Sequence, residues 1–285
     1  MPVLKKGDAV GLISCSDGLR QEDAIHLQTI RQQLIRLGLT PIEAKTIFRQ
    51  NGSPFSGSAK ARASELMRFY QSDKIKAIFD VSGGDSANQI LPHLDFAMIR
   101  RAAIPFVGIS DLSVINNAVY ACTDQPAYHY RIKNLSGAFA DQQKDVFQQS
   151  FMTDRSFSDR QLHWLRGHSM SGIVIGGNIR CFLKLAGTRY FPDPTDKIVF
   201  LEALGGGPAR MASLLAQLDQ LSVFKQCSGV LLGTFSEMQV KQYTPLIETL
   251  VLEISDRYHL PVAKTEQLGH GEDACCLPIG LPLTL

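Results

Sequence analysis

The sequence has little of several features that mark whole classes of protein. It contains a single tryptophan, and its 29 lysines and arginines nearly balance 27 aspartates and glutamates, for a formal net charge of +2. The basic residues are scattered, so no nucleic-acid surface is predicted. No apolar run is long enough to cross a bilayer, and the first residues leave no room for a secretory segment. We therefore expect a cytoplasmic protein with neither nucleic-acid nor membrane partners.

Cysteine-based chemistry is also poorly represented. The six cysteines are widely spread and form no Cys-x-x-Cys pair, which favours buried free thiols over disulfides. Histidines and cysteines nowhere cluster at metal-ligand spacing, so we expect no metal and no organic cofactor. The glycines do not form the Gly-x-Gly-x-x-Gly fingerprint, which makes a nucleotide-binding α/β protein the weaker alternative.

Length and pattern predict two domains. A chain of 285 residues exceeds what one core usually fills. Over residues 1–135, short apolar strands alternate with helical segments, which is typical of a parallel sheet with flanking helices. The apolar pattern weakens over residues 136–170, where we expect a connection that is helical around 146–151 and has no strong strand. A second domain is expected over residues 171–285. Ser58 is predicted to cap one helix, and Pro208 suits the first turn of another.

The first domain is organised around residues 75–96. The apolar run over 75–81 predicts a buried strand, which Gly83 and Gly84 end before a short helix begins near Asp85 or Ser86. Ligands bind outside the carboxyl ends of parallel strands. The free N–H groups of such a turn hold an anion, or they form an oxyanion hole beside a nucleophile. A turn without any chemistry is the alternative.

Two further polar residues follow predicted strands in the second domain. Glu202 ends the apolar run that begins at Lys197, and His270 lies between two glycines. A serine hydrolase needs a base that takes the serine proton and a carboxylate that orients the base, in any chain order. Ser86, His270 and Glu202 supply these three groups. Taken singly, Glu202 is equally well explained as a salt-bridged carboxylate and His270 as a surface histidine.

Several motifs, in order along nearly the whole chain, resemble the LD-carboxypeptidases, which include muramoyltetrapeptide carboxypeptidases and microcin C7 self-immunity proteins. The matching segments are 77–79 with Gly83-Gly84, Asn88 with 91–96, 106–111, 176–178, 198–202, 261–262 and 269–271. The resemblance implies an N-terminal α/β sheet domain, a C-terminal domain with a β-barrel-like core, and a homodimer. It also implies a Ser-His-Glu serine peptidase that removes a terminal D-residue from a cytoplasmic murein tetrapeptide.

By this resemblance, Glu202 is the orienting carboxylate, His270 the general base, and the backbone near Gly84 and Asp85 the oxyanion hole. The chain departs from the family pattern at the nucleophile: an ungapped alignment places Ala87, not Ser86, at the family's serine. One residue at a helix start turns a side chain by roughly 100°. Either the turn is remodelled so that Ser86 is the nucleophile, or the protein is a muropeptide-binding protein or uses another activated group such as Asp85 or water.

The other polar residues of these motifs are weighed in the same way. Asp111 is expected to cap the following helix. Arg180 and Arg210 are candidate clamps for a substrate carboxylate, because arginine binds carboxylates bidentately. The remaining candidates are Asn178, as a substrate contact or a structural turn, and His129, which by the resemblance lies near the substrate.

Overall fold

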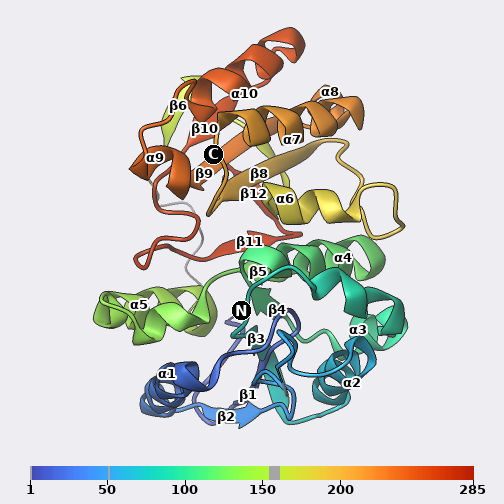
Figure 1. Cartoon of the computed structure of the whole chain (residues 1–285), viewed down its shortest axis with the longest axis vertical. Helices are drawn as coiled ribbons and strands as arrows, with labels where there is room; N and C mark the ends of the chain where they lie inside the picture. The colour runs from blue at the N-terminus through green and yellow to red at the C-terminus, as the bar shows by residue number, and fades with distance from the viewer. Residues whose placement is uncertain (1, 51, 154–160) are drawn as a thin grey trace.

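The computed structural model describes residues 2–50, 52–153 and 161–285. Two six-stranded sheets, mostly parallel and covered by helices, form the two lobes seen in Figure 1, and the second sheet is curled into a half-barrel. The predicted α/β fold with a barrel-like second core is therefore confirmed. The division at residues 135 and 171 stays a prediction, and residues 154–160 of the expected connection lie outside the described residues.

The first sheet carries the strands that the apolar runs predict. In order across it are β11 (Leu277–Ile279), β5 (Ala127–His129), β4 (Phe106–Gly108), β3 (Ile75–Asp80), β1 (Ala9–Ile13) and β2 (Thr40–Glu43). All pairs are parallel except β11 with β5. The carboxyl ends of β1, β3, β4 and β5 therefore meet at one edge, which is where ligands bind in parallel sheets.

Helices cover both faces of this sheet. Figure 1 shows α1 and α5 on one side and α2 and α3 on the other. The helices are α1 (Ala24–Arg36), α2 (Ala59–Tyr70), α3 (Phe96–Ala102), α4 (Ser113–Thr123) and α5 (Ala140–Phe147), with the shorter η1 (Gln21–Asp23), η2 (Ala87–His93), η3 (Ser110–Leu112), η4 (Ile132–Ser136) and η5 (Gln148–Met152). Ser58 caps α2 as predicted, since its hydroxyl accepts from the Ala61 N–H at 3.2 Å.

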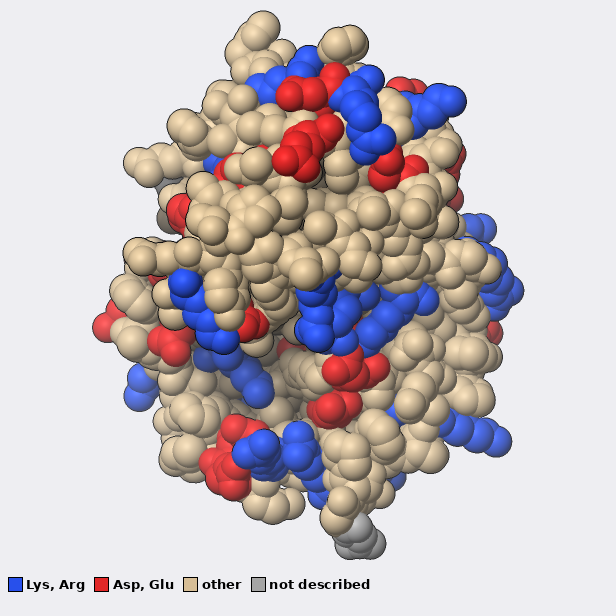
Figure 2. Space-filling view, turned by 45° about the horizontal axis from the view of Figure 1, so that its top comes forward, with Lys and Arg blue, Asp and Glu red and all other residues tan. Residues whose placement is uncertain are grey.

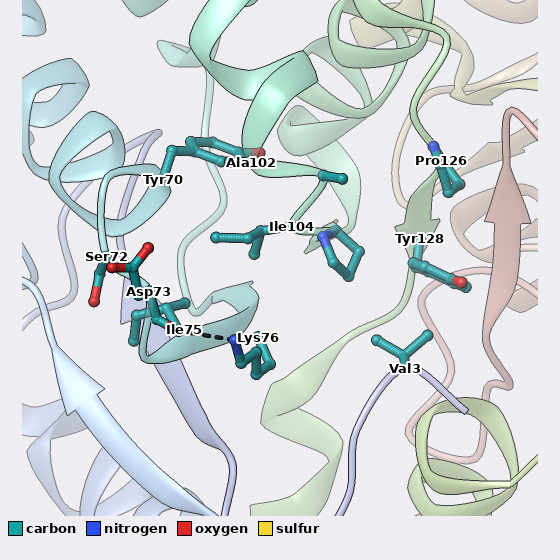
Figure 3. Close-up of a pocket in the computed structure, with 12 residues that line it drawn as sticks. Val3, Tyr70, Ser72, Asp73, Ile75, Lys76, Ala102, Ile104, Pro126 and Tyr128 are labelled. Atoms are coloured by element: carbon teal, nitrogen blue, oxygen red, sulfur yellow. Dashed lines mark hydrogen bonds between the residues drawn. The ribbon is translucent and has the colours of Figure 1, made fainter. Parts of the chain in front are cut away.

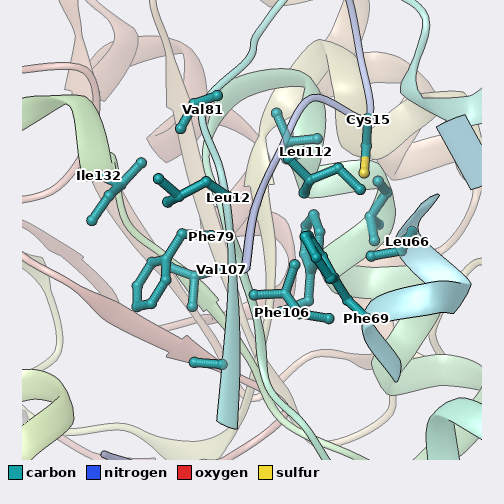
Figure 4. Packing of buried hydrophobic residues seen from close by; sticks show 14 of the residues in the cluster. Leu12, Cys15, Leu66, Phe69, Phe79, Val81, Phe106, Val107, Leu112 and Ile132 are labelled. Atoms are coloured by element: carbon teal, nitrogen blue, oxygen red, sulfur yellow. The ribbon is translucent and has the colours of Figure 1, made fainter. Parts of the chain in front are cut away.

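Apolar side chains fill the space between this sheet and its helices. Figure 4 shows Phe79 and Ile132 on one side of the central strand and Phe69 and Phe106 on the other. These four side chains are at most 1% exposed. Because both faces of β3 are buried, its sequence is a near-continuous apolar run rather than an alternating one, as is typical of parallel sheets.

The second sheet is built in the same way. Its strands, in order, are β12 (Pro282–Thr284), β7 (Ser171–Asn178), β8 (Lys197–Ala203), β9 (Gly229–Phe235), β10 (Val262–Lys264) and β6 (His163–Arg166). Its helices are α6 (Ile179–Phe182), η6 (Leu183–Leu185), α7 (Pro208–Gln220), α8 (Val223–Gln226), α9 (Ser236–Val240), α10 (Ile247–Ser255) and η7 (Asp256–Tyr258). Pro208 opens α7 as predicted, where its missing N–H costs nothing.

Three strands, β6, β11 and β12, were not foreseen. β6 lies within the expected connection, and the prediction of no strong strand there is wrong. It is a four-residue edge strand with one antiparallel neighbour, β10, so its sequence needs little apolar character. β11 comes from the end of the chain yet pairs with β5 in the first sheet. Its Leu277 and Ile279 pack with Phe200 of the second sheet, so this strand pairs in one sheet and packs its side chains in the core of the other.

The two lobes are also held by a close contact between α4 and β7. The Asn117 side chain donates to the Gly176 carbonyl at 2.7 Å and accepts from the Gly176 N–H at 2.8 Å. Gly177 has φ +136°, and a Cβ there would lie 2.4 Å from the Ser113 hydroxyl. Only glycine allows this approach. The contact places the carboxyl end of β5, in the first lobe, next to the carboxyl end of β8, in the second.

Candidate active site

Glu202 and His270 form a hydrogen-bonded pair. Glu202 lies at the end of β8 and is fully buried, and His270 follows β10 in a loop. His270 Nδ1 lies 2.5 Å from Glu202 Oε2, so the N–H donates to the carboxylate. His270 Nε2 is buried and has no hydrogen-bond partner among the described residues. The structure thus brings together the predicted base and the carboxylate predicted to orient it, and the other ring nitrogen has no partner among the described residues.

A second histidine faces the same carboxylate. His129, at the end of β5, is 1% exposed, and its Nε2 lies 3.8 Å from Glu202 Oε1. Burial raises the pKa of Glu202, but the charge and hydrogen bond of His270, together with the nearby charge of His129, outweigh it and bring the pKa to about 2. Glu202 therefore stays ionised. This pairing of His129 with Glu202 was missed at the level of sequence, because the two residues come from different lobes.

Ser86 is held in another network. It follows β3 and is buried, and its hydroxyl donates to Asp17 Oδ1 at 2.8 Å and accepts from Arg62 Nη1 at 3.1 Å. No hydrogen bond joins Ser86 to His270 in the described part of the chain. The structure therefore brings together two members of the predicted triad and holds the third in a separate cluster.

The predicted oxyanion residues also contact Asp17. Gly84 has φ +132°, and a Cβ there would lie 2.3 Å from the Asp17 carboxyl carbon, so this close approach requires glycine. The Asp85 N–H points to Asp17 Oδ1 at 3.5 Å. The Asp85 carboxylate pairs with Lys184 at 3.0 Å and with Arg180. An oxyanion hole at Gly84 and Asp85 stays a prediction.

The prediction that Asp111 caps a helix is wrong. α4 begins with Leu112 at its N-cap, and no side chain caps it. The fully buried Asp111 carboxylate instead accepts from the Ser16 hydroxyl at 2.7 Å and the Ala87 N–H at 2.8 Å, and it pairs with Lys184 at 2.5 Å. Asp111 thus fixes the turn at Ala87 and joins it to the second lobe.

The remaining candidates have structural contacts. Arg180 of α6 is paired with Asp85, and Arg210 is exposed. The Asn178 side chain accepts from the Cys181 N–H at 3.4 Å and so caps α6. Figure 2 shows cationic and anionic side chains gathered around a hollow between the two lobes.

A cavity of about 450 Å³ lies elsewhere, at the amino ends of β3, β4 and β5. Figure 3 shows Tyr70, Ile104 and Tyr128 around it, and Lys76 donates to the Asp73 carbonyl at 2.8 Å. Its lining residues include none of Ser86, Glu202 and His270. It is a separate cavity on the opposite edge of the first sheet.

The described residues contain neither a metal-binding cluster nor a membrane-spanning helix. No group of three or more histidine, cysteine, aspartate or glutamate side chains is placed to hold a metal ion there. Within the same residues, no helix has both the length and the apolar character needed to cross a membrane.

Comparisons with known proteins agree with this architecture. Residues 10–130 match the model of the LD-carboxypeptidase N-terminal domain, and residues 171–285 match that of the C-terminal domain. A putative carboxypeptidase of Treponema pallidum is 25% identical over 98% of this chain and 89% of its own length. A probable murein peptide carboxypeptidase of Bacillus subtilis is 24% identical over 97% and 88%.

A solved structure of MccF in complex with glutamyl sulfamoyl guanosine has the same fold, with a TM-score of 0.87 at 20% identity over 99% of this chain and 94% of that one. The two domain models together span most of the sequence, in the same order as the two lobes. The chain therefore belongs to the LD-carboxypeptidase family.

Proposed function

We propose that this protein is a serine-type carboxypeptidase that hydrolyses the amide before the C-terminal D-residue of a murein-derived tetrapeptide or a similar small peptide. The observation that carries the proposal is the 2.5 Å contact between His270 Nδ1 and Glu202 Oε2, which leaves Nε2 without a partner. An oriented imidazole of this kind is the general base that acyl transfer needs. The name of the Bacillus subtilis relative supports a murein peptide as substrate. The cytoplasmic location and the homodimer stay predictions.

In this mechanism Ser86 is the nucleophile. Its hydroxyl must first leave Asp17 and Arg62 and come within roughly 3 Å of His270 Nε2. His270 then takes the hydroxyl proton while Oγ bonds to the scissile carbonyl carbon, and it gives that proton to the leaving amine. Water, deprotonated by the same imidazole, hydrolyses the ester and releases the shortened peptide. Glu202 holds the ring in orientation throughout.

A second candidate is a peptide-binding protein without turnover. It is favoured by the network that holds Ser86 to Asp17 and Arg62, and by Ala87 at the family's nucleophile position. Loss of the nucleophile from a triad leaves a residual acceleration of only about 10³ to 10⁴ over water. Such a protein would bind its peptide and release it unchanged.

Mass spectrometry of a murein tetrapeptide incubated with the protein separates the two candidates. We expect the wild type to release D-alanine, His270→Ala to lower the rate by at least about 10³-fold, and Ser86→Ala to abolish release. Saturable binding without product in the wild type would favour the binding protein. In that case Ala87→Ser, which restores the family's hydroxyl, is expected to produce turnover.

Unchanged turnover in Ser86→Ala would remove Ser86 from the mechanism. Ser14→Ala is the matched control, because Ser14 is also a fully buried serine of the first lobe, and its hydroxyl has no hydrogen-bond partner among the described residues. Its rate is expected to stay within a few-fold of the wild type.

A further inference from the structure

Two neighbouring cationic side chains, one of which contacts the loop of the proposed base, form no ion pair among the described residues. Arg131 and Lys133 follow β5 at the carboxyl edge of the first sheet, where η4 begins. Arg131 Nη1 donates to the backbone carbonyl of His270 at 3.3 Å, and the Asn134 side chain donates to that of Gly271 at 3.1 Å. This segment therefore contacts the loop that carries the base.

Both cations are partly buried, yet neither forms an ion pair with any carboxylate that the structure describes. Burial lowers the pKa of Arg131 and of Lys133, while the nearby charges of Glu272 on Arg131, and of Asp23 and Asp80 on Lys133, act in the opposite direction. The Glu272 carboxylate accepts instead from the Ala138 N–H at 3.1 Å.

The other buried or half-buried cations around the cleft are occupied. Arg180 pairs with Asp85, Lys184 with Asp85 and Asp111, and Arg62 donates to the turn that carries Ser86. A partly desolvated cation without a counter-charge is costly, and a bound anion offsets that cost. The planar fork of arginine fits a carboxylate with two parallel hydrogen bonds.

We propose that Arg131, with Lys133 beside it, binds the free C-terminal carboxylate of the substrate. This inference rests on the proposed carboxypeptidase function and names the group by which that site selects its substrate. In a peptide, only the amide nitrogen and one Cα separate the scissile carbonyl carbon from the terminal carboxylate, a distance of roughly 4 Å. A clamp that contacts the backbone of His270 is therefore at the right range from the base.

Arg131 lies in the turn that directly follows β5, after His129 and Tyr130. The Tyr130 hydroxyl is buried and donates to Gln143 at 3.1 Å, so it is a packing residue. Arg131 is partly buried, and the contact that fixes its position is the one to the His270 carbonyl.

Isothermal titration calorimetry with two tetrapeptides tests the clamp without requiring turnover. One peptide ends in a carboxylate and the other, otherwise identical, in an amide. Charge-assisted hydrogen bonds are strong enough that we expect the wild type to bind the acid about 10- to 100-fold more tightly than the amide. Arg131→Gln is expected to remove that preference by weakening the acid alone, and Lys133→Gln to reduce it by a smaller factor.

Arg101→Gln is the matched control, since Arg101 is an exposed arginine of α3, and its acid preference is expected to equal that of the wild type. Retention of the full preference in Arg131→Gln would overturn the clamp but leave the proposed function standing. A wild type that binds neither peptide would contradict both. Circular dichroism melting checks that each variant is folded. If Arg131→Gln does not fold, Lys133→Gln decides the test, because the clamp predicts a reduced acid preference in that variant as well.

Discussion

At the residue scale, the feature that governs the site is a carboxylate buried between two imidazoles. Glu202 is fully buried, with His270 at 2.5 Å and His129 at 3.8 Å. A buried carboxylate is stable only when it is paired, and here the pairing carries the orientation of the base as well. Both histidines reach it from outside its own strand.

This pairing predicts a pH dependence of stability. The pKa of Glu202 in the folded protein, about 2, lies below its ordinary value of 4.5. The ionised group therefore contributes stability above about pH 4.5, and that contribution is lost as the pH falls toward 2. We expect Glu202→Gln to lower the free energy of unfolding by about 1–3 kcal/mol at pH 7, with the difference from wild type shrinking over that window.

Urea unfolding at a series of pH values measures this difference. Glu253→Gln is the control, because Glu253 is exposed and its loss is expected to change stability by less than about 0.5 kcal/mol at any pH. A Glu202→Gln difference that stays constant down to pH 2 would contradict the assignment of the low pKa to this residue.

At the element scale, α2 holds the turn that carries Ser86. Arg62 is fully buried and donates to the carbonyls of Cys15 and Ser16 at 2.6 and 2.9 Å, to the Ser86 hydroxyl, and to Gln89 at 2.9 Å. One side chain thus satisfies backbone and side-chain acceptors from the segments after β1 and β3. Sequence periodicity could only place Arg62 on a helix, not beneath a turn.

We expect Arg62→Met to lower the free energy of unfolding by about 3–5 kcal/mol, because it leaves several buried acceptors without donors. Methionine and arginine have similar helix propensity, so the loss is not one of helix formation. Arg68→Met, on the same helix, removes an exposed pair with Glu65 and is expected to cost less than about 1 kcal/mol. Chemical denaturation measures both, and equal losses would refute the role given to Arg62.

At the scale of the whole molecule, the last strands tie the two lobes together. β11 pairs with β5 in the first sheet while Leu277 packs in the core of the second, and β12 then pairs with β7. The Asn117 contact with Gly176 adds a second tie. Because His270, the proposed base, comes from one lobe and the Ser86 turn from the other, the geometry of the proposed site depends on these ties.

We therefore expect calorimetry to show one unfolding transition for both lobes. Leu277→Ala is expected to lower the free energy of unfolding by about 2–5 kcal/mol through a cavity in the core of the second lobe, and to move that single transition to lower temperature. Pro282→Ala, at an exposed position of β12, is the control. Two separate transitions, only one of them moved by Leu277→Ala, would show that the lobes unfold independently.

The sequence by itself determined the local elements. Apolar runs ended by glycines located β3 and β8, Ser58 and Pro208 marked helix starts, and the positions of Glu202 and His270 at strand and loop ends indicated a base with its carboxylate. These signals are local because they depend on which side chains a strand buries and which backbone angles glycine permits.

The tertiary structure decided the polar partners. Ser86 meets Asp17 across 69 positions, and Asp111 meets Lys184 across 73. The sequence misplaced Asp111 as a cap and did not foresee that β11 joins the first sheet. Such contacts depend on the order of strands in a sheet and on how closely two lobes pack, and neither is encoded in the spacing of neighbouring residues.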